Sequence, residues 1–339
     1  MTTIDPGTLM GPLWTLLAYI GLGWLAARRL AVDPRPVATL LIYLVAPLTF
    51  FRGLVQGGPT PDYLLLTAAL FTLASMIAVV VHCLARRGFA PQESALLAFS
   101  SGTGNTGYFG LPVALVLLPP QGVTLYLFCV LGVTLYEFTV GFYLSARGQF
   151  SVRQSLVKIA RLPLVYAFLA ALLVSGLGLK VPDTVMQGLA AFPATYTLLG
   201  MMIIGMTLGR VSVREVDLRF IGACVAIRFG LWPLLSLAAV LGLQVLFPLS
   251  GELALALLLI GVVPMAANVV VVAMELGIAP EKGALAVLIT TLAAPLLIPL
   301  YLGGMMPDGL YTLGAAAWKR WTLLASGPGD LFPAVITSA

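Results

Sequence analysis

The chain has 339 residues, of which 60% are hydrophobic and only 9% are charged, and its mean hydropathy is +1.05. Soluble domains carry about 25% charged residues, so this composition excludes a soluble globular protein and predicts an all-α polytopic membrane protein. The net charge of +5 does not require a nucleic-acid partner, because most of the basic residues fall in short loops between apolar blocks.

A membrane-spanning helix needs about 20 apolar residues, and the chain separates into about ten such blocks. Their expected ranges are 9–27, 36–56, 62–85, 94–118, 122–146, 162–179, 185–209, 217–247, 252–277 and 282–303. The segment 2–7 has no basic residue, so we expect no cleaved signal peptide and a first span that remains in the protein.

The basic residues are divided unevenly between the loops on the two sides of the membrane. With the N-terminus outside, the predicted cytoplasmic loops hold 13 of the 18 basic residues, whereas the opposite side holds only Arg52, Lys180, Lys319 and Arg320. Cytoplasmic loops are enriched in Lys and Arg. The bias therefore predicts an even number of spans in the cell (inner) membrane, with both termini on the periplasmic side.

A polar segment, 147–161, divides the chain into two halves of about five spans each. We expect a first five-helix repeat at 1–146, a cytoplasmic linker at 147–161 and a second five-helix repeat at 162–304. The tail 305–339 contains a candidate interfacial helix. Because five is an odd number, the halves must have opposite orientations, as in the inverted repeats of many transporters.

The fourth span of each half is interrupted by residues that disfavour a continuous helix. The interruptions are 105–112 (NTGYFGLP) and 264–268 (PMAAN). Irregular backbone at membrane depth survives only where it lines a cavity or is buried in protein. Two interrupted spans in corresponding positions are typical of the midplane binding site of a secondary transporter.

The interruptions bring polar and flexible residues to the middle of the membrane. The candidate substrate-binding residues are Gly104, Asn105, Thr106, Gly107, Tyr108, Pro264, Ala267, Asn268 and, from another span, Arg228. The second part of each broken helix would point free backbone N–H groups and a positive dipole end at the cavity. Asn105 and Asn268 add donors and acceptors there. The alternative is that both Asn side chains only cap the half-helices.

Two ionisable residues, Glu137 and Arg228, fall deep within the fifth and eighth spans. A charge at the bilayer centre costs at least ~2.5–3.5 kcal/mol, so each should face the protein interior and have a partner. In one interpretation Glu137 carries the coupling ion and Arg228 anchors an anionic substrate. The alternatives are a buried Glu137–Arg228 ion pair, or an Arg228 side chain that reaches a membrane interface.

The coupling ion is predicted from the position of the carboxylates. Sodium favours oxygen ligands with compensating negative charge, but residues 261–274 around the second break contain no carboxylate. The deep carboxylate is Glu137, so we expect protons rather than sodium as the coupling ion. Uniport is the main alternative.

The first break also resembles a known family. Residues 104–112 (GNTGYFGLP) resemble the Asn-x-Gly-x-x-Gly-x-Pro stretch of the auxin efflux carrier family, and the likeness covers 9–303. The resemblance implies the sodium/proton-antiporter-type fold, which is related to that of bile acid/sodium symporters. In that fold a scaffold of spans 1, 2, 6 and 7 lies beside a transport core of spans 3–5 and 8–10, in which broken helices 4 and 9 cross. It also implies a homodimer and elevator-type transport of small organic anions, mostly carboxylates.

The chain departs from plant members of this family, which carry a long hydrophilic loop between the halves; here that loop shrinks to 147–161, as in bacterial members. Auxin itself is therefore not implied as the substrate.

The single histidine and the lack of a metal-binding motif argue against an intramembrane enzyme, and we expect no cofactor and no metal. Loops too short for an ATPase domain argue against primary active transport. A channel and a non-transporting membrane receptor stay open as alternatives.

Overall fold

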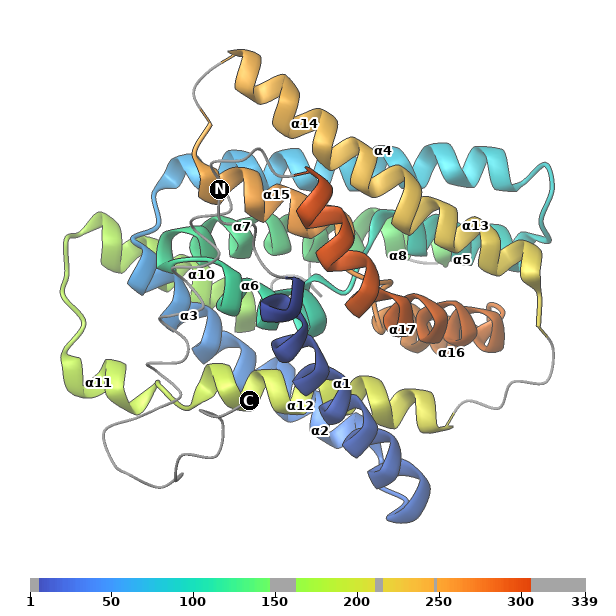
Figure 1. Ribbon diagram of the computed structural model, residues 1–339, viewed down its shortest axis with the longest axis horizontal. Coiled ribbons are helices and arrows are strands. Elements are labelled where there is room, and N and C mark those ends of the chain that lie inside the picture. Colours follow the sequence, from blue (N-terminus) through green and yellow to red (C-terminus); the bar gives the residue numbers. More distant parts are fainter. Residues whose placement is uncertain (1–5, 147–162, 211–215, 247–248, 306–339) are drawn as a thin grey trace.

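The computed structural model describes residues 6–146, 163–210, 216–246 and 249–305, and every regular element in these ranges is helical. The helices run mostly along the long axis of the molecule (Figure 1). The expected linker 147–161 and residues 306–339 of the expected tail lie outside the described residues. Within the described residues, six helical segments could cross a membrane by length and composition: Pro34–Gly57, Pro61–Ala85, Pro120–Ser145, Asp183–Arg210, Leu218–Leu246 and Pro280–Leu302.

In the first half, several helices begin at a proline. The first N–H groups of a helix have no intrahelical partner, so a proline, which lacks an N–H, loses no hydrogen bond there. The continuous helices are α1 (Pro6–Arg29), α2 (Pro34–Leu40), α3 (Ala46–Gly57), α4 (Leu64–Ala85), α5 (Pro91–Gly102), α6 (Leu111–Leu117), α7 (Pro120–Tyr136) and α8 (Phe142–Ser145). Short segments join them: a 3₁₀ turn, η2 (Pro61–Tyr63), and the π-helical η1 (Leu41–Val45), η3 (Thr106–Gly110) and η4 (Glu137–Gly141).

The second half has a comparable series of helices. They are α10 (Pro163–Gly176), α11 (Asp183–Gly188), α12 (Phe192–Arg210), α13 (Leu218–Ala226), the π-helical η5 (Ile227–Leu231), α14 (Trp232–Leu246), α15 (Gly251–Val262), α16 (Asn268–Leu276) and α17 (Pro280–Met305). Both predicted interruptions are present, between α5 and η3 and between α15 and α16. The division into two inverted five-helix repeats stays a prediction.

The helices can be divided into two groups, which contact each other chiefly where α3 packs on α7. One consists of α1, α2, α3, α10, α11 and α12, in which α1 packs along α12 and α3 packs on α10. The other consists of α4–α8 and α13–α17, in which α4 contacts α5 and α7, and α13 contacts α5 and α17. We refer to them as the scaffold group and the core group. Within the scaffold group α1 and α12 touch backbone to backbone, because a Cβ on Gly23 would lie 2.7 Å from the Cα of Met202.

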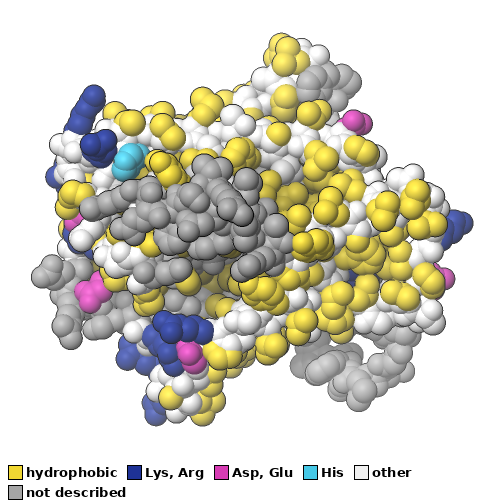
Figure 2. All heavy atoms as spheres, turned by 180° about the vertical axis from the view of Figure 1, so that it is seen from behind, with side chains coloured by type: hydrophobic (Ala, Val, Ile, Leu, Met, Phe, Trp, Pro, Cys, Tyr) yellow, Lys and Arg dark blue, Asp and Glu magenta, His cyan; other side chains and the backbone are white. Residues whose placement is uncertain are grey.

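The charged residues gather at one end of the molecule. In Figure 2 most of the Lys and Arg side chains on this face lie at the left, and hydrophobic side chains cover much of the remaining surface that is not drawn in grey. That end is the right of Figure 1, where α1, α4, α12 and α16 end and where α13 and α17 begin. The basic residues at these termini include Arg28, Arg29, Arg86, Arg87, Arg210, Arg219 and Lys282. A basic end beside an apolar band suits a multi-pass membrane protein.

Ion pairs at the basic end join helices of the same group. In the core group, Lys282 Nζ lies 2.5 Å from both Glu93 Oε1 and Asp217 Oδ2, which ties the starts of α17, α5 and α13 together. Lys282 donates a hydrogen bond to Asp217 and thereby holds the pKa of that carboxyl below its usual range, with help from the backbone N–H of Phe220. In the scaffold group, Arg210 pairs with Asp33 at 3.2 Å. No ion pair among the described residues joins the two groups.

Candidate functional site

The two helix breaks meet inside the core group. The backbone N–H of Asn105 donates to the carbonyl of Pro264, with an N–O distance of 2.7 Å. Asn105 Oδ1 accepts a hydrogen bond from the N–H of Phe109 at 3.2 Å, so this side chain caps η3 as one interpretation predicts. Asn268 is the first residue of α16, but its side chain does not cap that helix. Its Nδ2 donates to Glu137 instead.

Side chains from neighbouring helices bind backbone groups on both sides of the breaks. The hydrogen bonds run from Trp232 Nε1 to Ser101 O (2.7 Å), from Tyr136 Oη to Ala98 O and Phe99 O (both 3.0 Å), from Tyr126 Oη to Thr106 O (2.8 Å), and from Met265 N to Thr290 Oγ1 (3.3 Å). Lipid offers no hydrogen bonds, so an interrupted span needs such internal partners. Buried polar side chains on α7, α14 and α17 therefore make the breaks stable at membrane depth.

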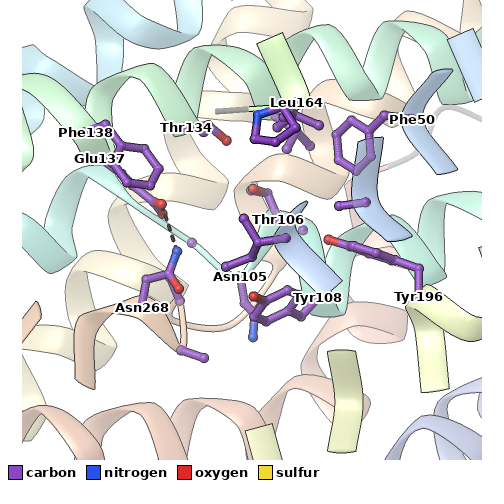
Figure 3. Close-up of a pocket in the computed structure, with 18 residues that line it drawn as sticks. Phe50, Asn105, Thr106, Tyr108, Thr134, Glu137, Phe138, Leu164, Tyr196 and Asn268 are labelled. Carbon is purple, nitrogen blue, oxygen red and sulfur yellow. Dashed lines mark hydrogen bonds between the residues drawn. The ribbon is translucent and has the colours of Figure 1, made fainter. Parts of the chain in front are cut away.

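Glu137 links the two breaks. It is the first residue of the π-helical segment η4. Thr103, which follows α5, donates its hydroxyl hydrogen to Oε1, and Asn268 Nδ2 donates to Oε2 at 3.0 Å (Figure 3). The carboxylate thus lies at the N-terminal end of α16, where the helix dipole is positive and favours a negative charge.

Arg228 binds the second break from behind. Its side chain is buried, with Nε donating to Val263 O and Nη2 donating to Ile260 O at 2.5 Å. The guanidinium carbon lies 5.2 Å from the centre of the Trp232 ring. The described residues contain no Glu137–Arg228 ion pair, and the buried side chain does not reach an interface. Both alternatives for Arg228 are therefore wrong.

A cavity of about 110 Å³ lies between the breaks and the scaffold group. Its core-group wall consists of Gly104, Asn105, Thr106, Gly107, Tyr108, Val130, Thr134, Glu137, Phe138, Ala266, Ala267 and Asn268. The scaffold-group wall consists of Ile42, Ala46, Phe50, Pro163, Leu164 and Tyr196. Figure 3 shows Glu137 and Asn268 on one side of the cavity, with Phe50 and Tyr196 opposite them. The volume restricts an occupant to a small molecule.

Most of the residues predicted from the sequence line this cavity. They are Gly104, Asn105, Thr106, Gly107, Tyr108, Glu137, Ala267 and Asn268. Pro264 and Arg228 do not line it: Pro264 contributes its carbonyl to the crossing, and Arg228 lies behind Gly104. Sequence reasoning missed the scaffold-group wall, because Phe50 and Tyr196 cannot be told from ordinary packing residues in an apolar helix.

One polar atom of the cavity wall has no partner. Four buried side-chain nitrogen or oxygen atoms in the described residues lack a hydrogen bond, and among them only Asn105 Nδ2 belongs to a residue that lines the cavity. An unsatisfied buried donor costs about 1–3 kcal/mol, and such groups in native structures commonly mark a missing ligand or water. Asn105 therefore caps η3 with its oxygen, while its buried amide nitrogen has no hydrogen-bond partner among the described residues.

Comparisons with known proteins identify the family to which the chain belongs. The family model described as "Membrane transport protein" matches residues 8–302. A protein of Methanocaldococcus jannaschii named as an uncharacterized transporter is 25% identical over 178 residues, which is 50% of this chain and 58% of that protein. The chain thus aligns with little more than half the length of this relative. The predicted resemblance is confirmed, and the chain belongs to the membrane transport protein family, whose members are auxin efflux carrier-like.

Proposed function

We propose that the protein is a secondary transporter that carries small organic anions, carboxylates above all, together with protons. The observation that carries this proposal is the position of Glu137. One carboxylate is hydrogen-bonded to both helix breaks and also lines the cavity between the two helix groups. A titratable group in this position can sense both the substrate and the relative arrangement of the breaks.

The preference for an anion rests on the donors at the first break. Asn105 Nδ2 is free and buried beside the cavity, and the N-terminal end of η3 adds a positive dipole end. At the second break the corresponding end of α16 already has a carboxylate, Glu137. An incoming carboxylate would therefore bind at the Asn105 end of the cavity and would face Glu137 across it.

Coupling to protons follows from the repulsion between these two carboxylates. Like charges that share a site disfavour ionisation of one of them. A proton on Glu137 would remove the repulsion, so a bound anion and a bound proton stabilise each other. Release of either one on the other side of the membrane would weaken the binding of its companion. This linkage is the thermodynamic basis of symport.

The elevator-type movement rests on the contacts between the groups. The cavity has one wall in each group, whereas the ion pairs of the described residues lie within a group. At the boundary Tyr108 of the core group packs on Gly200 of α12, where an added Cβ would lie 3.3 Å from the Tyr108 ring. Apolar packing against glycine would permit sliding at this point, whereas the hydrogen bond from Thr124 Oγ1 of α7 to Gly53 O of α3 would have to break.

The Glu137→Gln substitution tests the coupling. Purified protein in proteoliposomes is screened with radiolabelled lactate, succinate and benzoate, and the best substrate is then followed with and without an imposed pH gradient. The wild-type protein should take up substrate faster when the source side is acidic. The Gln variant keeps the shape and hydrogen bonds of a protonated Glu137, so uptake should continue but should no longer respond to the gradient.

Glu252→Gln is the matched control, since it removes a carboxylate from the first turn of α15, and Glu252 does not line the cavity. This variant should keep the wild-type response to pH. A gradient response that survives in Glu137→Gln, or uptake that depends on sodium, would refute proton coupling through Glu137. Wild-type uptake that ignores the gradient would identify a uniporter.

A further inference from the structure

Arg228 occupies a cage of backbone carbonyl groups. Its two hydrogen bonds go to Ile260 and Val263, at the end of α15. The last carbonyls of a helix have no intrahelical partner, and they form the negative end of the helix dipole. The guanidinium thus supplies both the missing donors and a compensating charge at the end of this half-helix.

The first break closes the other side of the cage. A Cβ on Gly104 would lie 2.6 Å from Arg228 Nη2 and 2.7 Å from Nη1, so the guanidinium fills the space that a side chain would need there. The Trp232 ring covers a further face, and its Nε1 donates to Ser101 near the end of α5. The cation is therefore enclosed where the C-terminal ends of α5 and α15 approach each other.

No acidic side chain among the described residues neutralises Arg228. Both oxygens of Glu137 are bound by Thr103 and Asn268, and the nearby Tyr126 hydroxyl donates to Thr106. The positive charge is stabilised by carbonyl dipoles and by an aromatic face. Rings of backbone carbonyls around a positive charge are how proteins and channels bind free cations.

We propose that Arg228 is a tethered cation that fills a carbonyl-lined cation site between the two breaks and holds the ends of α5 and α15 together. It is a positioning residue and not a ligand of the transported substrate. Removal of its side chain leaves a site for a small planar cation with N–H donors. This inference concerns the stability of the crossing and does not depend on transport, on the substrate or on proton coupling.

The experiment compares Arg228→Ala with the wild-type protein in detergent by thermal melting. The variant should melt about 5–10 °C lower, because it leaves buried carbonyls without donors. Millimolar guanidinium chloride should raise the melting temperature of the variant by mass action, with ionic strength held constant by NaCl. The wild-type protein should not respond. Urea has the same planar shape and N–H donors but no charge, so it should not restore the variant.

Arg52→Ala is the matched control, because Arg52 also lies within a candidate span but its Nη1 binds the Gln56 side chain at 3.1 Å. Guanidinium should not raise its melting temperature. Equal effects of guanidinium and urea on Arg228→Ala, or an equal effect of guanidinium on both alanine variants, would overturn the proposal. If Arg228→Ala does not fold, Arg228→Lys and Arg228→Gln replace it. The charged lysine variant should be the more stable, and the reverse order would overturn the proposal.

Discussion

At the scale of single residues, the side chain of Asn105 offers one atom for capping and another for the proposed contact with the substrate. Capping and ligand contact are alternatives for a sequence, but a side-chain amide has an acceptor and a donor that point in different directions. Oδ1 is bound to the N–H of Phe109, and Nδ2 is left without a partner. The loss of stability in an Asn105 variant can therefore be measured separately from the loss of substrate binding.

The Asn105→Ala and Asn105→Ser pair makes this separation. Both variants lose the free amide donor, and a lost hydrogen bond to a charged group, worth about 1.5–3 kcal/mol, predicts a roughly 10–100-fold rise in KM for the transported anion. Serine keeps an N-cap oxygen, so only the alanine variant should lose about 1 kcal/mol of stability. Uptake kinetics and thermal melting measure the two effects. A serine variant with wild-type KM would show that Nδ2 does not bind the substrate.

The residues beside the breaks could be predicted because asparagine, glycine and proline are conspicuous in an apolar helix. The role of Arg228 could not be predicted from the sequence. The sequence shows that a deep cation needs partners, but it does not show whether those partners are a carboxylate, a substrate or backbone carbonyls. The partners turn out to be Ile260 and Val263, whose side chains give no sign that their carbonyls are free.

At the scale of elements, the positions of the helices follow closely from hydropathy, whereas their local geometry does not. The expected span 62–85 corresponds to η2 and α4, which together cover 61–85.

The π-helical segments η4 and η5, which begin at Glu137 and Ile227, have no sequence signal of their own. Such wider turns occur frequently at functional sites, and here they contain the two deep charged residues. Pro47 lies two residues after η1. A proline inside a helix removes a backbone donor, which accounts for the wider turn just before it.

The ion-pair cluster at the starts of α5, α13 and α17 predicts a pH-dependent contribution to stability. The pKa of Asp217 is lowered in the folded protein, so its contribution is complete above the usual pKa near ~3.9 and is lost as the pH falls through the lowered value. At neutral pH Asp217→Asn should melt about 1–4 °C below the wild type. This difference should shrink toward zero under strongly acidic conditions.

Melting curves in detergent between neutral and acidic pH measure the effect. Asp62→Asn is the comparison, because Asp62 is exposed at the opposite end of α4 and makes no ion pair among the described residues. A difference between Asp217→Asn and the wild type that stays constant through acidification would show that the carboxylate charge is not what stabilises the cluster.

At the scale of the whole molecule, the sequence predicts an orientation in the membrane that labelling can test. Asp62 and Arg87 are exposed at the two ends of the α4 span. In a Cys83→Ala background, needed because Cys83 is exposed, a membrane-impermeant maleimide should label Asp62→Cys on intact cells. Arg87→Cys should react only after permeabilisation. Labelling of both positions from outside, or of Arg87→Cys alone, would contradict the positive-inside assignment.

The confinement of ion pairs within each helix group has a consequence for energetics. Among the described residues, Lys282 and Arg210 each bind acidic partners of their own group, so displacement of one group past the other need not pull apart opposite charges or strip water from them. In the proposed movement the work of reorientation would then fall on dispersion contacts such as Tyr108 on Gly200 and on the hydrogen bond from Thr124 Oγ1 of α7 to Gly53 O of α3. Salt should therefore change the stability of each group but have little effect on the rate at which one group moves along the other.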